Sequence, residues 1–124
     1  MKYTLVIKIG IIFCVLSVLI GAFGAHALEN IIGEKMDVFK TGVQYHMFHS
    51  ISLILVGLLS KSFNINLQNI GYLLLTGIIL FSGSLYLISI YKYSFLGIIT
   101  PIGGMCFITA WCILLYKISF NINN

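Results

Sequence analysis

Long apolar runs alternate along the chain with short polar segments. The stretches without a charged residue cover positions 9–28, 41–60, 62–91 and 93–116. Each is close to or above the roughly 20 residues with which an α-helix crosses a hydrocarbon core of about 30 Å. The pattern predicts an all-α fold, an integral membrane four-helix antiparallel bundle in a single domain. The expected helices cover roughly residues 5–28, 37–60, 69–91 and 96–117.

Composition and charge agree with a membrane protein. Of the 124 residues, 60% are hydrophobic and 8% are charged, whereas soluble domains carry roughly 25% charged residues. The net charge of +4 comes from seven basic residues, all of them lysines, spread thinly near the expected helix ends. Because nucleic-acid binding needs a clustered basic face, the chain is not expected to bind nucleic acid. The lipid bilayer is the expected partner.

The N-terminal segment has the features of a secretory signal peptide, with a positive start, an apolar centre and an Ala-His-Ala site at 25–27. We expect this segment to be retained as the first helix, because three further apolar segments follow. Ser17, Gly21 and Ala25 recur at every fourth position, a spacing typical of close contacts between membrane helices. The spacing predicts that this row is buried between helices.

Two residues are predicted to cap helices. The Asp37 side chain is placed to accept hydrogen bonds from the free N–H groups that start the second helix. Thr100 is the expected cap of the fourth helix, with Pro101 at its first position. The alternative is a fourth helix that starts near Phe95 and is kinked at Pro101.

The first half of the second expected helix holds the richest polar segment of the chain. On a period of 3.6 residues its small and polar side chains fall on one stripe. Ionisable groups at membrane depth are costly and therefore point toward protein, so this stripe is predicted to be buried. Its members are Gly42, His46, His49, Ser50, Gly57 and Ser60.

The alternating direction of four spans brings the polar ends of all four helices to the same side of the membrane. The opposite halves of the helices are mostly aliphatic. We therefore expect one polar cluster in one leaflet, and we take it as the candidate ligand site. Its members are His26, Gln44, Tyr45, His46, His49, Ser82, Ser84, Tyr86 and Thr100.

Four segments of the chain resemble a bacterial family of small inner-membrane proteins known as domain of unknown function 423, or UPF0382, which has an uncharacterised animal transmembrane relative. The matching segments are GAFGAH at 21–26, QYHMFH at 44–49, FSGSLY at 81–86 and TPIGG at 100–104, with Trp111. They lie in all four expected helices. The resemblance implies a multi-pass membrane protein of the bacterial inner membrane and brings no established activity, cofactor or catalytic residue.

The lysines bear on the orientation in that membrane. Four lie on the side of the termini and the second loop, at positions 2, 8, 61 and 117, and three on the other side, at 35, 40 and 92. Since cytoplasmic segments carry an excess of basic residues, the count favours cytoplasmic termini.

Three interpretations of the polar cluster remain open. In the first, its hydrogen bonds only fix the register of the bundle. In the second, it binds a small molecule or a lipid headgroup, because ligands bind where a few polar groups converge on a concave site. In the third, His26, His46 and His49 bind a metal ion or haem, although the chain has no Cys-x-x-Cys or His-Glu-x-x-His motif.

Catalysis and transport find less support in the sequence. The uncharged stretches contain no carboxylate, and Glu29 and Asp37 belong to the loop before the second of them. We therefore assign no catalytic residue and no cofactor and expect the protein not to be an enzyme. A secondary transporter would be expected to show internal repeats, and the two halves of the chain are only loosely alike. A subunit of a small-solute transporter stays as an alternative function. A homo-oligomer stays open as the assembly of the chain.

Overall fold

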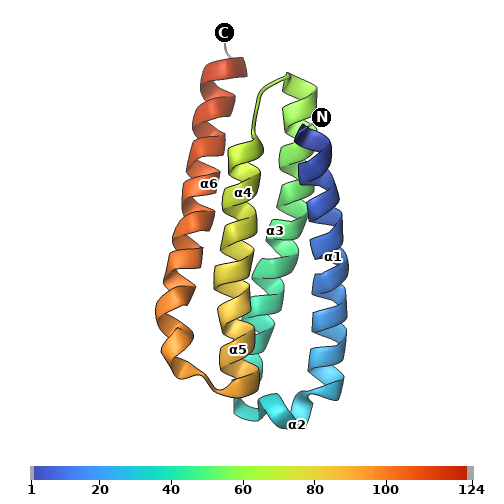
Figure 1. The fold of residues 1–124 in the computed structure, drawn as a ribbon, viewed down its shortest axis with the longest axis vertical. Coiled ribbons are helices and arrows are strands. Elements are labelled where there is room, and N and C mark those ends of the chain that lie inside the picture. The colour runs from blue at the N-terminus through green and yellow to red at the C-terminus, as the bar shows by residue number, and fades with distance from the viewer. Residues whose placement is uncertain (1, 123–124) are drawn as a thin grey trace.

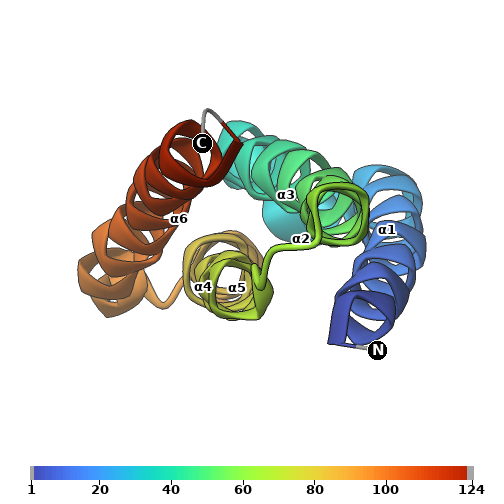
Figure 2. The same cartoon turned by 90° about the horizontal axis from the view of Figure 1, so that it is seen from above.

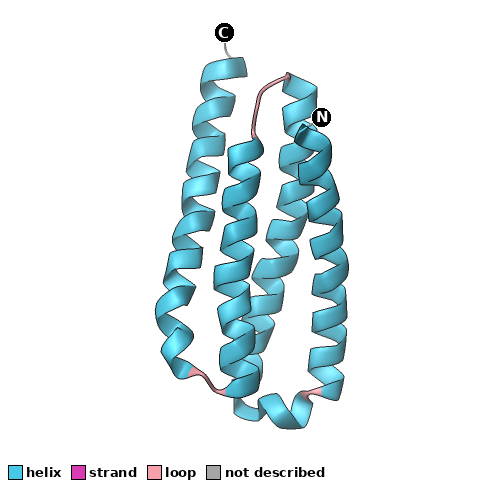
Figure 3. Cartoon of the chain, in the orientation of Figure 1, coloured by secondary structure: helices cyan, strands magenta, loops and turns pink. Residues whose placement is uncertain are grey.

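The predicted spans are helical in the computed structural model, which describes residues 2–122. None of these residues lies in a strand (Figure 3), and four helical stretches are long and apolar enough to cross a membrane. The predicted all-α four-helix bundle is therefore confirmed. In chain order the elements are α1 (Lys2–Ala27), α2 (Glu29–Ile32), η1 (Gly33–Lys35), α3 (Met36–Phe63), α4 (Gln68–Gly77), η2 (Ile78–Ser82), α5 (Gly83–Tyr91), η3 (Ser94–Ile98) and α6 (Ile99–Ile122).

Elements α4, η2 and α5 follow one another without a break and form the third span. Figure 1 shows that neighbouring spans run in opposite directions. The start of α1, the end of α6 and the loop 64–67 lie at one end of the bundle, which we call the terminal end. The helix α2 and the link at 92–93 lie at the other, which we call the α2 end.

The spans form an open row rather than a closed square. Helix α1 packs along α3, α3 packs on the third span, and the third span packs on α6. Seen along the bundle, α1 and α6 occupy the two outer positions (Figure 2). The backbones of α3 and α6 hardly approach each other, so any link between these two helices depends on long side chains.

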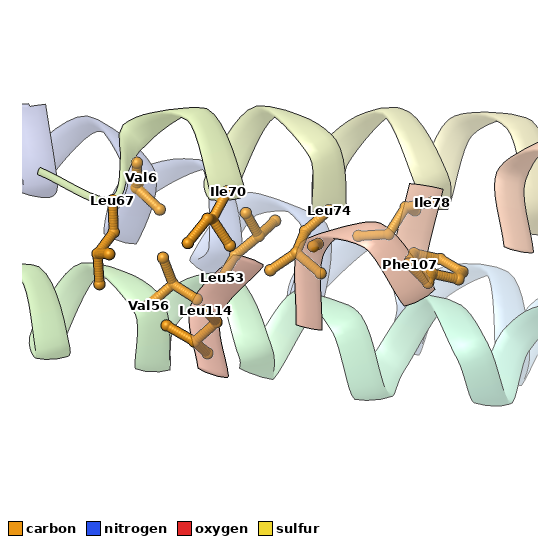
Figure 4. Packing of buried hydrophobic residues seen from close by; sticks show 10 residues of the cluster. Val6, Leu53, Val56, Leu67, Ile70, Leu74, Ile78, Phe107 and Leu114 are labelled. Atoms are coloured by element: carbon orange, nitrogen blue, oxygen red, sulfur yellow. The ribbon is translucent and has the colours of Figure 1, made fainter. Parts of the chain in front are cut away.

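The largest buried apolar cluster gathers side chains from all four spans, and its central members are seen in Figure 4. In α3 and α6 its members lie nearer to the terminal end than the polar positions 42–50 and 100–104 do. The bundle thus has an aliphatic half and a polar half, in keeping with the sequence pattern. The buried members are Val6, Leu53, Val56, Leu67, Ile70, Leu74, Ile78, Phe107, Ala110 and Leu114.

The contact between α1 and α3 rests on small residues with a spacing of seven. Gly10, Ser17 and Gly24 of α1 are all buried, and a Cβ atom added at Gly24 would overlap the Phe39 ring. The predicted row with a spacing of four is thus only partly right, because Gly21 and its next member at 25 are half-buried. A spacing of seven keeps residues on one face of two helices that cross with a left-handed twist, whereas a spacing of four drifts around the helix.

Both predicted caps are wrong. Helix α3 begins one residue before Asp37, and the capping position is occupied by Lys35, whose side chain makes no capping bond. The cause is that α2 and η1 already hold residues 29–35 in helical turns. Thr100 lies inside α6, and Pro101 is in its first turn, where a missing N–H costs little. Residues 94–98 form the 3₁₀ turn η3, which runs directly into α6. The helical stretch thus begins at Ser94, close to the start near Phe95 of the alternative prediction.

The element η2 is a π-helical turn in the middle of the third span. Such turns are wider than an α-helix and occur frequently at functional sites. Helix α6 meets it at Gly103, where an added Cβ would run into the backbone of Phe81. At Gly104, one position later, the nearest atom to an added Cβ is 3.8 Å away, in the Phe81 ring. The backbone of α6 therefore packs closely on this turn at Gly103.

Candidate functional site

His46 on α3 lies between α1 and α5 in the polar half of the bundle. The residue is 3% exposed, and its Nδ1 atom lies 2.8 Å from the Tyr86 hydroxyl. Either group donates this hydrogen bond, depending on the tautomer of the histidine. The Phe13 ring of α1 meets the imidazole edge-on at 5.7 Å. The second ring nitrogen, Nε2, is buried and has no hydrogen-bond partner among the described residues.

His49, one turn further along α3, is held at both ring nitrogens. Nδ1 lies 2.9 Å from the Tyr45 carbonyl oxygen, and the Trp111 Nε1–H of α6 donates to Nε2 at 3.2 Å. Because an indole N–H can only donate, Nε2 accepts and Nδ1 carries the proton. The ring also stacks on Phe107 with the centroids 3.6 Å apart. His49 is therefore a neutral bridge between α3 and α6, with no free nitrogen for a metal ion.

Hydroxyl groups join the third span to α6. The Ser84 and Thr100 hydroxyls lie 2.5 Å apart, and Ser84 also donates to the Phe81 carbonyl oxygen at 2.9 Å. Ser84 has a single proton, so Thr100 is the donor between the two hydroxyls. Ser82, in the π-helical turn, is fully buried, and its hydroxyl has no partner among the described residues.

A recess of about 260 Å³ lies on α3 beside the histidine bridge, lined by Gln44, Tyr45, Phe48 and His49. The Tyr45 ring packs on Phe81 of the third span with the centroids 4.5 Å apart, which fixes its position. The side chains of Gln44 and Tyr45 are exposed. Within residues 2–122 their polar side-chain atoms form no hydrogen bond. The recess thus presents two polar groups that are free to bind a further molecule.

The structure divides the predicted site residues into small groups rather than one cluster, with Gln44, Tyr45 and His49 together at the recess. His46 meets Tyr86, and Ser84 meets Thr100. His26 is exposed at the end of α1 and joins neither pair. Its position follows from Gly24, which faces α3, since two residues further along a helix the side chain points to nearly the opposite face. Residues 2–122 contain no group of three His, Cys, Asp or Glu side chains that could hold a metal ion.

Three aromatic residues of the site were not among the predicted positions. Trp111 and Phe107 clamp His49, and Phe13 covers His46. A signal for Trp111 was present in the sequence, because a tryptophan inside a membrane span needs a partner for its N–H. Apolar rings such as Phe13 and Phe107 carry no comparable signal among the many phenylalanines of the spans.

Comparison with known proteins places the chain in a family. The family model described as "Protein of unknown function (DUF423)" matches residues 20–104. The UPF0382 membrane protein SH2409 of Staphylococcus haemolyticus is 43% identical over 90% of this chain and 92% of its own length. The UPF0382 membrane protein YwdK of Bacillus subtilis is 45% identical over 87% of this chain and 90% of its own length. No solved structure matches the chain. The chain is therefore a membrane protein and belongs to the DUF423 family, whose members here carry the name UPF0382.

Proposed function

We propose that the protein binds the polar end of a membrane amphiphile, a lipid or a small lipid-like molecule, in the recess on α3. The observation that carries this proposal is a contrast between two Gln and Tyr pairs. Gln68 and Tyr72 on α4 satisfy each other, with the amide nitrogen 2.6 Å from the hydroxyl. The polar side-chain atoms of Gln44 and Tyr45, which line the recess, have no hydrogen-bond partner among the described residues. Polar groups inside a span are costly when they stay unpaired, which favours a bound partner for them.

The depth and size of the recess agree with such a ligand. Gln44 is four residues beyond Lys40, or about 6 Å along the helix axis, which is the depth of the polar groups that link a lipid head to its chains. At about 260 Å³ the recess is slightly smaller than a site for a whole drug-sized ligand. It therefore takes the polar end, while the apolar body lies along exposed side chains of α3 such as Ile51 and Leu55.

The same proposal makes the protein a binding protein and not an enzyme. No carboxylate lines the recess to act as a general acid or base, and His49 uses both nitrogens in the bridge. We place the protein in the bacterial inner membrane with cytoplasmic termini, because the terminal end carries four of the seven lysines. The recess would then open to the outer leaflet.

The experiment compares lipids that copurify with two matched double variants. Gln44→Leu with Tyr45→Phe removes the polar groups of the recess and keeps its shape. Gln68→Leu with Tyr72→Phe makes the same chemical changes outside the recess. We expect native mass spectrometry to detect an amphiphile enriched on the wild-type protein. Loss of two hydrogen bonds should weaken its binding about tenfold in the first variant and leave it unchanged in the second.

Two results would contradict the proposal. One is a wild-type protein that carries no amphiphile above its share of the membrane lipid. The other is an equal loss of bound amphiphile in both double variants. Metal analysis of the same samples tests the metal or haem alternative, and a cofactor lost on His49→Gln would favour that alternative over the one proposed.

A further inference from the structure

The charges of the chain are divided unequally between the two ends of the bundle. The α2 end holds three lysines and all three acidic residues, so its formal charge is zero. The terminal end holds four lysines and no acidic residue, so it carries the whole net charge of +4. The four are Lys2, Lys8, Lys61 and Lys117. The terminal end therefore presents positive charge that no carboxylate of the described chain neutralises.

Two of these four lysines, Lys2 and Lys61, line a pocket where the start of α1 meets the end of α3. The pocket has a volume of about 480 Å³ and lies between the N-terminal turn of α1 and the loop 64–67. Two lysines, a tyrosine, a serine and two asparagines contribute polar groups to its lining. The lining residues are Lys2, Tyr3, Ser60, Lys61, Asn64, Ile65 and Asn66.

The loop wall of the pocket is held in place by short contacts. The Ser60 hydroxyl donates to the Ile65 carbonyl oxygen at 2.5 Å, and the Ile65 N–H donates to the Ser60 carbonyl oxygen at 3.2 Å. Asn64 ends α3 in the left-handed conformation with φ 52°, which asparagine tolerates better than most residues. Lys117 of α6 donates to the Asn66 carbonyl oxygen at 2.9 Å. The loop is thus a built wall and not a loose segment.

The two lysines of the pocket keep their charges available. The Lys61 ammonium lies 5.9 Å from the centre of the Tyr3 ring, a cation–π contact that positions the group without removing its charge. The Lys2 side chain is exposed at the start of α1. All acidic residues of the chain lie at the other end of the bundle. An anion of suitable size would therefore meet two ammonium groups from different helices.

We propose that this pocket binds the phosphate group of an anionic phospholipid from the leaflet at the terminal end. Inorganic phosphate shares this chemistry, but the position of the pocket favours the lipid. The pocket lies where two spans begin and end, and basic pockets between membrane helices bind anionic headgroups. Tyr3 provides the aromatic side chain that is typical of the membrane interface. The site is separate from the recess on α3, so neither proposal depends on the other.

The experiment measures binding of defined lipids to the purified full-length protein by native mass spectrometry. The probes are dioleoylphosphatidylglycerol, which is anionic, and dioleoylphosphatidylcholine, which has no net charge. We expect the anionic lipid to bind more tightly. Lys2→Gln with Lys61→Gln should weaken its binding about thirtyfold, from the contribution of each lysine near an anionic surface. The control Lys35→Gln with Lys40→Gln removes the same charge at the α2 end and should change binding less than about twofold.

A second variant tests the pocket without removing a lysine. Asn64→Asp places a carboxylate in the wall, and aspartate also tolerates the left-handed conformation. It should weaken binding of the anionic lipid about fivefold, as expected for cancelling one lysine. The proposal is wrong if the two lysine pairs weaken binding equally, if both lipids bind alike, or if Asn64→Asp has no effect. Displacement of the lipid by millimolar inorganic phosphate would overturn the choice of a lipid as the ligand.

Discussion

Helix α3 is packed in opposite ways on its two sides. Toward α1, glycine and serine let the two backbones come close, with Gly10 against Ile54 and Gly57 against Ile7. Toward α6, the backbones stay apart, and the gap is filled by the stacked rings of His49 and Phe107. One hydrogen bond from Trp111 closes this second contact.

The difference follows from the lack of a hydrophobic driving force between helices in lipid. Helices associate there through close van der Waals contact or through hydrogen bonds between side chains. The contact between α1 and α3 uses the first means, and the link between α3 and α6 uses the second. The aromatic link leaves room beside it, and the recess at Tyr45 and Phe48 lies there, on the open side of α3. Close packing therefore holds α1 and α3 together, and the aromatic bridge between α3 and α6 borders the recess.

The largest effect is expected where backbones touch. At Gly10 an added Cβ would lie 2.8 Å from Ile54 Cγ1 and 3.0 Å from the Ile54 backbone nitrogen. Backbone cannot yield as a side chain can, so Gly10→Leu should lower the free energy of unfolding by about 3 kcal/mol. Reversible unfolding in mixed detergent micelles measures this change. The exposed Leu19 supplies the control, since Leu19→Ala should stay within about 0.5 kcal/mol.

Gly21→Leu tests whether the loss of stability depends on how closely the two helices approach. An added Cβ at Gly21 would meet only the Val43 side chain, at 3.0 Å, and a side chain can turn away. We therefore expect a smaller loss than for Gly10→Leu. Equal losses for Gly10→Leu and the exposed Leu19→Ala would show that α1 is not packed on α3 as described.

A second effect is expected where α6 meets the π-helical turn. Gly103→Ala should cost about 2 kcal/mol, because its Cβ would meet the backbone of the π-helical turn at Phe81. Gly104→Ala is the matched control, with 3.8 Å of space to the Phe81 ring. The same unfolding measurement applies to both. If the two alanine variants were equally stable, α6 would have to lie further from the third span.

The sequence predicted the parts of the molecule that depend on composition and period. The four spans follow from the length of the apolar runs, and the burial of His46, His49 and Gly42 follows from the cost of polar groups in lipid and from their shared stripe. These arguments need only the position of a residue along a helix and around it. These arguments therefore apply to any helix bundle that lipid surrounds.

The sequence did not predict which side chains would meet across helices. The site positions fall into separate small groups and leave His26 outside, because their contacts depend on the rotation of each helix and on the gap between α3 and α6. The seven-residue row at Gly10 and Gly24 depends on the crossing of α1 with α3. The π-helical turn is a further feature with no recognisable sequence signal. Such features are set by packing and not by local pattern.

The bridge between α3 and α6 is expected to contribute less to the free energy of unfolding than the glycine contacts do. Trp111→Phe keeps a ring and removes the N–H that bonds to His49 Nε2, leaving a buried acceptor unpaired. The expected loss is about 1.5 kcal/mol, near the upper limit for a bond between membrane helices. His49→Gln keeps an acceptor but loses the stack on Phe107, so its cost should be about 1 kcal/mol.

A double-mutant cycle of Trp111→Phe with His49→Phe, which keeps a ring but leaves no acceptor, separates the bond from the rings. If Trp111 and His49 interact, the double variant should be more stable than the sum of the single effects predicts, by about 0.6 to 1.7 kcal/mol. Phe48→Leu near the bridge serves as a control for a change of ring volume. A coupling energy of zero would mean that the bond does not form in the membrane.

The smallest effect is expected at the link between His46 and Tyr86. Tyr86→Phe removes the hydroxyl that lies 2.8 Å from His46 Nδ1 and leaves the ring packed against Phe39. Since bonds between membrane helices average about 0.6 kcal/mol, a loss of that size is expected in detergent unfolding. Tyr91→Phe, at an exposed position of the same helix, should cost nothing measurable. A loss well above about 2 kcal/mol for Tyr86→Phe would exceed what one such bond supplies. It would place His46 in a larger hydrogen-bonded network that includes its buried Nε2. Hydrogen bonds would then stabilise the side of α3 that faces α1 as well as the side that faces α6.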